Sequence, residues 1–522
     1  MVEHVHLNHK LVIMKVAAFI KLIIVFFFLS VTHLSAQKVV YSEPDKDEIK
    51  GSAFEIIGKV NGNFLVYKNY RDDHTITAYN SQMKIVDKAN LNFLPDRVLN
   101  TDFIAYSSSF IMFYQYQKRS IVYSMAIKLD GKGNKMGEPV ELDTTDVNFM
   151  ANNKLYSIIS SENKQMIVSY KVNNKSDKNH IVTTVLFDKD LNLIKKSLLN
   201  ISMPDRNDFL NNFSVDNDGD LVFLRAAGTS QSDNINKLSL YFKAKNADNY
   251  LFSEIKVGSI YLDDVSLKID NFNKRYLVSS FFSKQRRGNV DGLFCHIWDK
   301  QKGTELITSA SVFADDFRND AKGENGTKGA FNDYFLKQII SKQDGGFIVM
   351  AEAVYTSSRG GGNNSRWDYW GSPNYGNSGN GFYSYGNTWG NPWNRWNSFN
   401  NVTRYYADNI AIISYDSTAK IEWTNTVAKS QYDDNSDDLL GYAMANTGEN
   451  IHILFNVQEK RNLILTDQFI SVEGQVTRNP TLKNLDRGYD FMPKHAKQVG
   501  AKQIIVPCQY RNYICFAKID FN

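Results

Sequence analysis

A repeated pattern of tight turns between apolar runs limits the fold of this chain more than any other feature. Each turn is rich in Asn, Asp, Gly or Ser, and a hydrophobic run such as FLVY, FIMF, LVFL or FIVM follows it. The spacing is about fifty residues except where insertions occur, which is typical of stacked four-stranded units. The eight turns are Asn61-Gly62-Asn63, Ser107 to Ser109, Glu162-Asn163-Lys164, Asp218-Gly219-Asp220, Asn271 to Lys274, Asp344-Gly345-Gly346, Thr447-Gly448-Glu449 and Val499-Gly500.

A second type of turn occurs later in each unit, where an aromatic or apolar residue precedes Asn or Asp and a polar strand follows. We find seven of these second turns against eight first turns. The difference arises because the last unit, from Tyr489 to Asn522, has only three strands. The run Lys38 to Glu43 (KVVYSE) is a strand without a unit, and we expect it to become the fourth strand of the last unit. Such pairing closes a ring and removes two exposed sheet edges.

Composition supports an all-β fold. Aromatic residues make up 13% of the chain and only nine prolines occur, as expected for pleated strands joined by tight turns. With its repeated four-stranded unit, the sequence resembles the β-propeller superfamily and, within it, exported bacterial propeller proteins. The resemblance covers nearly all of residues 38–522, which we expect to form a single domain of eight blades, with seven as the alternative. It carries over no functional residues, because the sequence has no repeated WD dipeptide pattern, no kelch signature and no exact Asp box.

The N-terminus has the pattern of a cleavable signal peptide. Lys15 and Lys21 precede the apolar run LIIVFFFLS, and Leu34-Ser35-Ala36 supplies small residues before a cleavage site. We therefore expect residues 1–36 to be removed and the protein to be secreted or periplasmic, without a stable membrane span. Translation starting at Met14 would give a signal peptide of more typical proportions.

Two insertions interrupt the repeat, at about residues 312–328 and 357–404. The second is rich in Gly, Asn, Ser and aromatic residues and holds five of the seven tryptophans. Loops on a rigid scaffold often bind ligands, and Trp and Tyr rings suit sugar stacking or a protein partner, although such a tract can also simply pack over its own blade. Both insertions should leave from the same face, together with a basic pair in a neighbouring loop. The candidate binding residues are Trp367, Tyr369, Trp370, Tyr383, Tyr385, Trp389, Trp393, Trp396, Arg286 and Arg287.

Acidic residues give weaker signals. Asp216, Asp218 and Asp220 alternate as in a calcium loop, but the Gly and Glu positions of such a loop are not matched, and a plain Asp-Gly hairpin fits better. The run from Asp433 to Asp438 could hold a cation or serve a hydrolase, but a solvated loop is the simpler interpretation. We expect no metal and no cofactor.

Cys508 and Cys515 lie directly opposite each other if Arg511-Asn512 is the tip of a hairpin. A disulfide is one reading. Because this would be a hydrogen-bonded pair of positions, where bridging is strained, buried free thiols fit better.

The sequence favours an exported, non-enzymatic binding or scaffolding protein that recognises a protein or a glycan through the face with the insertions. The net charge is only +4, and the basic residues are scattered along the sequence, so we expect neither nucleic acid nor an anionic membrane as partner. The alternative is a polysaccharide- or peptide-directed hydrolase or lyase with carboxylates at the channel mouth. A structural envelope component is a third reading.

Overall fold

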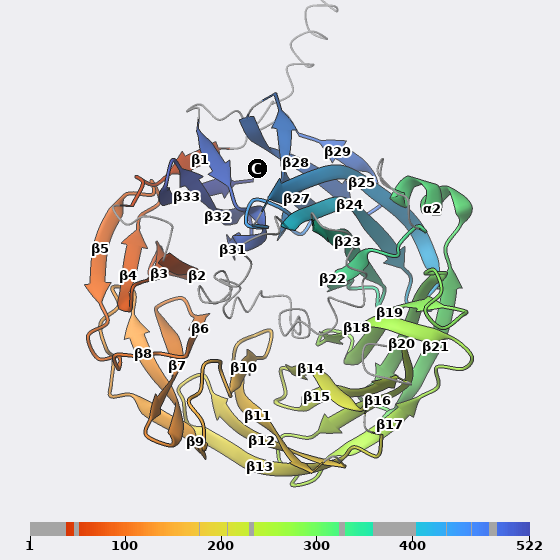
Figure 1. Ribbon diagram of the computed structural model, residues 1–522, viewed down its shortest axis with the longest axis horizontal. Helices are drawn as coiled ribbons and strands as arrows, with labels where there is room; N and C mark the ends of the chain where they lie inside the picture. The colour runs from red at the N-terminus through yellow and green to blue at the C-terminus, as the bar shows by residue number, and fades with distance from the viewer. Residues whose placement is uncertain are drawn as a thin grey trace, which may run out of the picture.

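The chain folds into a ring of four-stranded antiparallel units (Figure 1). The structure is a computed structural model. It describes residues 38–45, 52–176, 178–205, 207–228, 234–322, 329–358, 403–434, 436–460, 462–479 and 488–521. The predicted signal peptide and all the candidate binding tryptophans and tyrosines lie outside these described residues. None of the helices in the described part of the chain has the length and apolar character that a membrane-spanning helix needs.

The first four units follow one another along the chain, each running from the centre of the ring outwards. Unit 1 holds β2 (Ser52–Val60), β3 (Asn63–Tyr70), β4 (Asp73–Tyr79) and β5 (Ile85–Asn90). Unit 2 holds β6 (Asn100–Ala105), β7 (Ser109–Lys118), β8 (Ile121–Asp130) and β9 (Val140–Asp146). Unit 3 holds β10 (Ser157–Ser160), β11 (Met166–Ser176), β12 (Asn179–Asp188) and β13 (Leu193–Ser202). Unit 4 holds β14 (Phe209–Val215), β15 (Leu221–Gly228), β16 (Ile235–Lys243) and β17 (Leu251–Ile255).

The remaining units complete the ring. Unit 5 holds β18 (Tyr261–Asp270), β19 (Arg275–Ser283), β20 (Gly292–Asp299) and β21 (Thr304–Val312), and the helix α2 (Asp315–Ala321) follows it. Unit 6 holds β22 (Tyr334–Ser341), β23 (Phe347–Ser358), β24 (Thr403–Tyr415) and β25 (Ile421–Asp434). Unit 7 holds β26 (Tyr442–Asn446), β27 (Asn450–Glu459), β28 (Asn462–Ser471) and β29 (Val476–Arg478). Unit 8 holds β30 (Tyr489–Phe491), the 3-10 helix η2 (Pro493–His495), β31 (Lys497–Gly500), β32 (Gln503–Tyr510), β33 (Tyr513–Asp520) and β1 (Lys38–Tyr41).

The fold is therefore an all-β propeller with eight four-stranded units, as the turn count predicts. Hydrogen bonding groups the strands into seven sheets, because a single pair, Ile235 with Leu262, joins units 4 and 5 into one eight-stranded sheet. The turn pattern does not predict this pair, because turns indicate pairing within a unit and this pair joins the third strand of one unit to the first strand of the next.

The N-terminal strand closes the ring, as the sequence predicts. β1 pairs with β33 over four residues, from Lys38 opposite Asp520 to Tyr41 opposite Ala517. The first strand of unit 8 departs from the expectation, because η2 divides it into β30 and β31, which both pair with β32. The first turn of this unit lies at Ala501 and Lys502 and not at Val499-Gly500, since a register shift lets β31 continue through Gly500.

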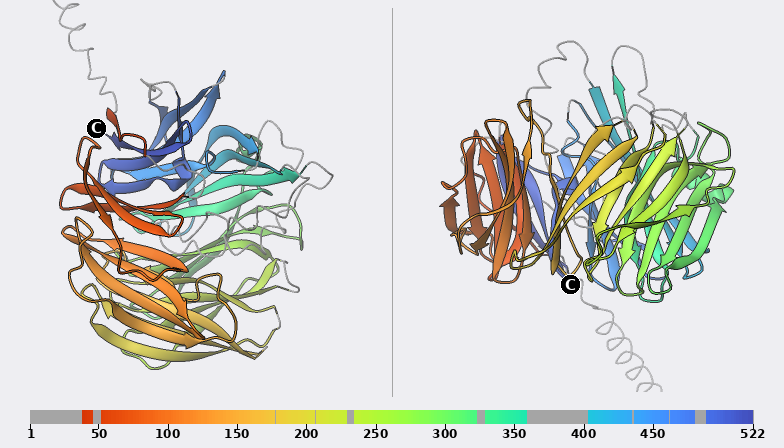
Figure 2. Two further views of the ribbon diagram at one scale, coloured as in Figure 1. Left: turned by 60° about the vertical axis from the view of Figure 1, so that its left-hand side comes forward. Right: turned by 90° about the horizontal axis from the view of Figure 1, so that it is seen from below.

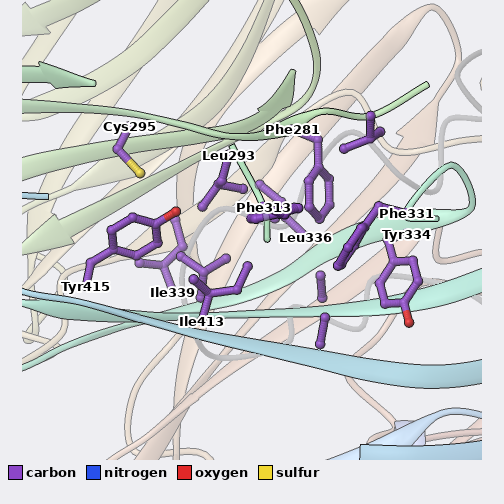
Figure 3. Close-up of a cluster of buried hydrophobic side chains, with 14 of the residues drawn as sticks. Phe281, Leu293, Cys295, Phe313, Phe331, Tyr334, Leu336, Ile339, Ile413 and Tyr415 are labelled. Atoms are coloured by element: carbon purple, nitrogen blue, oxygen red, sulfur yellow. The ribbon is translucent and has the colours of Figure 1, made fainter. Parts of the chain in front are cut away.

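The hydrophobic core lies between neighbouring units. Middle strands such as β3 and β7 are buried over runs of five or more residues because they are covered on both faces, whereas the outer strand β13 alternates between buried and exposed positions. Figure 3 shows the cluster between units 5 and 6. Its labelled members are Phe281, Leu293, Cys295, Phe313, Phe331, Tyr334, Leu336, Ile339, Ile413 and Tyr415.

Strand direction gives the ring two different faces. The turns between first and second strands and between third and fourth strands lie on one side, which we call the turn face. The loops between second and third strands and the connections between units lie on the other side, which we call the loop face. β33 ends on the turn face, and the right-hand view of Figure 2 shows the C-terminus on the side opposite to the ends of β23 and β24.

Hydrogen bonds link the turns of successive units on the turn face. The backbone N–H of Asn163 donates to Asn217 Oδ1 at 3.0 Å, and the N–H of Asn217 donates to Asn271 Oδ1 at 2.9 Å, so three units are joined in series. Units 7 and 8 are joined by Gln498, which both accepts from and donates to the backbone of Asn446. The turn face is thus a tightly connected part of the scaffold.

Cys508 and Cys515 are paired across the hairpin whose tip is Arg511-Asn512, the register that the sequence predicts. Both are buried free thiols, with their Sγ atoms 2.9 Å apart. Burial and the neighbouring thiol raise the pKa of Cys508 well above its usual value. The structure therefore has the free thiols that the sequence favours over a disulfide.

Candidate functional site

The large second insertion is anchored on the loop face by unit 6. β23 and β24 pair up to Ser358 and Thr403, the last described residues on either side of it. The rings of Tyr355 and Tyr406 stack at its base with centroids 4.5 Å apart. Arg404 then binds Asp434 through two hydrogen bonds of 2.7 and 3.0 Å. The insertion therefore begins and ends on a rigid, well-packed hairpin.

The first insertion contains the helix α2, which the sequence analysis does not predict. Phe317 and Ala321 are buried with Phe313 in the core cluster of units 5 and 6. The Tyr334 hydroxyl donates to the carbonyl of Ala321 at 2.8 Å, and Asn409 of β24 donates to Asp320 O at 3.3 Å. The helix therefore packs beside β24, the strand that follows the second insertion. The spacing of four residues between Phe313, Phe317 and Ala321 was the signal that could have predicted it.

Arg286 and Arg287 lie in the loop between β19 and β20, on the same face as both insertions, as the topology predicts. Both side chains are exposed. The backbone N–H of Arg287 donates to Asn234 Oδ1 at 2.7 Å, which ties this loop to unit 4. The structure thus gathers these arginines and α2 over adjoining units.

The acidic connection from unit 6 to unit 7 is bound to unit 8 and is more than a solvated loop. Lys494 Nζ lies 2.6 Å from Asp437 and 3.9 Å from Asp438. His495 Nε2 lies 3.4 Å from Asp438. Burial alone would raise the pKa of Asp438, but the bond to His495 and the charge of Lys494 outweigh it and hold that pKa well below its usual range. These carboxylates already have cationic partners in the fold.

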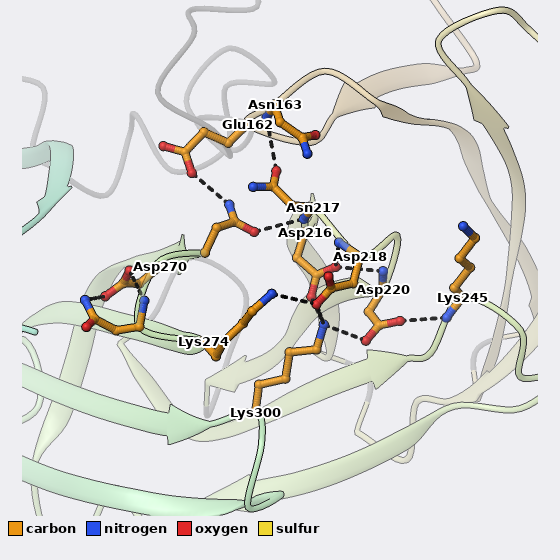
Figure 4. A network of polar contacts seen from close by, with 12 residues as sticks. Glu162, Asn163, Asp216, Asn217, Asp218, Asp220, Lys245, Asp270, Lys274 and Lys300 are labelled. Carbon is orange, nitrogen blue, oxygen red and sulfur yellow. Dashed lines mark hydrogen bonds and ion pairs between the residues drawn. The ribbon is translucent and has the colours of Figure 1, made fainter. Parts of the chain in front are cut away.

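Asp216, Asp218 and Asp220 converge on an ammonium group and not on an open cation site (Figure 4). Lys300 Nζ lies 2.5, 2.8 and 2.8 Å from the three carboxylates in turn. Asp216 Oδ1 also accepts the backbone N–H groups of Asp218 and Asp220, as an Asp-Gly hairpin requires. Among the described residues no group of three or more His, Cys, Asp or Glu side chains could hold a metal ion.

Charged side chains from three innermost strands interact across the inner wall of the ring. They are Glu55 of β2, Asp102 of β6 and Lys497 of β31. Burial raises the pKa of Glu55 to about 8; Lys497 opposes this shift and Asp102 adds to it. Burial also lowers the pKa of Lys497, while Glu55 opposes that shift. Perturbed acid and base groups of this kind mark candidate functional positions, and their wide separation in the sequence hid them from pattern analysis.

The sheet topology and the position of the insertions define a β-propeller whose loop face carries the departures from the repeat. No protein-family model matches the sequence, and no curated protein matches it. Among solved structures, the quinohemoprotein alcohol dehydrogenase from Comamonas testosteroni is similar at 10% identity with a TM-score of 0.38, over 92% of this chain and 78% of that chain. A Synechocystis apocarotenoid oxygenase mutant is similar at 8% identity with a TM-score of 0.31, over 71% of this chain and 72% of that chain.

Prolyl oligopeptidase B from Galerina marginata is similar at 10% identity with a TM-score of 0.38. The match covers 88% of this chain but 56% of that chain. We assign the fold from the strand pairing of this chain itself.

Proposed function

We propose that this protein is an exported, non-enzymatic binding or scaffolding propeller that recognises a protein or a glycan through its loop face. The observation that carries the proposal is that the two longest departures from the repeat leave the same face over units 5 and 6. α2 and the paired ends of β23 and β24 give them a rigid base. The turn face, by contrast, uses its polar groups to bond units to one another.

Rigid scaffolds with variable loops are a common way to build a binding surface, because the scaffold bears the stability and the loops supply the contacts. Five tryptophans in one insertion offer apolar ring faces with a polar edge, which suit both sugar rings and protein partners. We propose no cofactor, no metal and no nucleic acid for this activity.

The alternative function is a polysaccharide-directed hydrolase, and the inner-wall charges favour it. With its pKa near 8, Glu55 would be protonated at neutral pH and could donate a proton, and Asp102 lies close enough for their charges to interact. This alternative predicts cleavage of a polysaccharide that stops in the variant Glu55→Gln.

Removing the second insertion tests the binding proposal. Because Ser358 and Thr403 are paired, an Asn-Gly turn can replace residues 359–402 without disturbing the hairpin. We expect this variant to keep its melting temperature and to lose the proteins or glycans that the wild type retains in pull-down and glycan-array assays. A matched variant keeps the insertion but replaces Trp367, Trp370, Trp389, Trp393 and Trp396 by Ala. If the deletion variant folds and retains every ligand, the proposal is wrong.

A further inference from the structure

Four basic residues occupy the same position in four hairpins of the loop face. Arg71, Arg119, Lys460 and Arg511 each follow directly after the second strand of a unit, at the first residue of a two-residue turn. All four have a left-handed backbone, with φ values of 52°, 56°, 58° and 56° in that order. Asn, Asp and Gly are the residues that adopt this conformation most readily. A long basic side chain at this position is therefore unfavourable for the turn itself.

These four residues belong to units 7, 8, 1 and 2, which are consecutive around the closed ring. We call them the basic arc. All four side chains are exposed. None of them forms an ion pair with a residue in the part of the chain that the structure describes. Asp72 lies in the turn of Arg71, and Asp73 and Glu459 are the strand residues beside two of the turns, but none of the three forms an ion pair with the basic arc.

Basic residues with the same backbone conformation on the turn face are used differently. Lys164, with a φ of 58°, donates to the carbonyl of Ala105 in the neighbouring unit. Lys274, with a φ of 53°, lies 3.0 Å from Asp218. On the turn face the strained basic residues therefore join the scaffold together, whereas those of the basic arc have no such role. A left-handed backbone at a basic residue that joins no neighbouring unit in the described part of the chain indicates a functional position.

Tyrosine rings accompany the basic arc. The guanidinium of Arg71 lies 5.0 Å from the ring centroid of Tyr70, and that of Arg511 lies 5.4 Å from Tyr510. Beside the turn of Arg119, the rings of Tyr116 and Tyr123 stack at 5.0 Å with an angle of 9°. The same pair of chemical groups, a cation and an aromatic ring, thus recurs on three neighbouring units.

We propose that the basic arc binds a carboxylated polysaccharide, one whose sugar units carry uronic-acid groups. Guanidinium groups bind carboxylates through paired hydrogen bonds, and tyrosine rings stack on the faces of sugars. A ring of like units places these groups at repeated intervals, which matches a polymer with regularly repeated charges. This inference rests on the proposed function and names the ligand class for the same face.

The test uses the full-length mature protein and polygalacturonate as the probe. In one variant the four residues of the basic arc become Gln (R71Q, R119Q, K460Q and R511Q). In a matched control, four exposed turn-face lysines become Gln (K84Q, K132Q, K189Q and K502Q), so both variants lose the same charge. We expect the arc variant to raise the Kd by at least about tenfold, and the control to stay within about twofold. Wild-type binding should weaken as salt rises.

Three results would overturn the inference. They are no binding of polygalacturonate by the wild type, an equal loss in both variants, and equally tight binding of polyglutamate, which would indicate an acidic protein instead. Both variants keep the second insertion intact, so the deletion of residues 359–402 tests the proposed binding function separately. Melting temperatures of both variants identify any loss that comes from unfolding.

Discussion

A chain that begins at Pro44 will melt well below one that begins at Gln37, because it lacks the strand that closes the ring. β1 supplies four residue pairs with β33. The ring of Tyr41 packs on Tyr489 at 4.7 Å, and Ser42 exchanges hydrogen bonds with Phe516. Losing these contacts should lower the free energy of unfolding by on the order of 3–5 kcal/mol and expose the edge of β33.

A peptide with the sequence of residues 37–43 provides the control. Added to the shortened chain, it should pair with β33 and recover part of the lost melting temperature. Equal melting temperatures for the two chains would contradict closure by β1. If the signal peptide is cleaved after Ala36, as we expect, cleavage leaves this strand free to pair.

The variant Asp143→Ala should also be strongly destabilised. Asp143 of β9 binds Lys171 at 2.8 Å and Lys196 at 2.7 Å, and Lys171 is itself buried between units 2 and 3. Removing the carboxylate leaves a buried ammonium without its anion, which costs about 3–5 kcal/mol. Asp146→Ala on the same strand is the matched control. Asp146 is exposed, and its loss should change stability by less than about 0.5 kcal/mol.

The effect of Asp143→Ala should depend on pH. Burial opposes ionisation of Asp143, but the hydrogen bonds from Lys171 and Lys196 outweigh it and lower its pKa below the usual 3.8. The wild type therefore holds its full advantage above pH 3.8 and loses it as the pH falls through the lower, folded-state value. Urea unfolding at several pH values measures this difference. A gap between wild type and variant that stays constant down to pH 2 would contradict the ion pair.

The fold could be predicted from the sequence largely because turn chemistry is local. The pairs Asp218-Gly219 and Asn61-Gly62 predict hairpin turns. The number of turns of each type predicts the eight units and the strand that closes the ring. Cys508 and Cys515 are predicted to face each other because the hairpin between them has the two-residue turn Arg511-Asn512. All these predictions use only residues that are close to one another in the sequence.

Contacts between distant residues could not be predicted in this way. Lys300 lies 84 residues from Asp216, and no local pattern brings them together. The basic arc was also hidden, because its members are tens of residues apart and share a face only through the strand register. Basic residues are scattered along the sequence, but the fold brings four of them to the loop face of four consecutive units.

The central claim is that the loop face binds the ligand, and blocking one face at a time tests it most directly. The three native cysteines are buried, so a single new cysteine can be coupled to polyethylene glycol. Lys284→Cys places the polymer on the loop face of unit 5, and Gln301→Cys places it on the turn face of the same unit. We predict that the polymer on residue 284 abolishes retention of the proteins and glycans that the variant without residues 359–402 also loses, while the polymer on residue 301 leaves it unchanged. The reverse result would contradict the account.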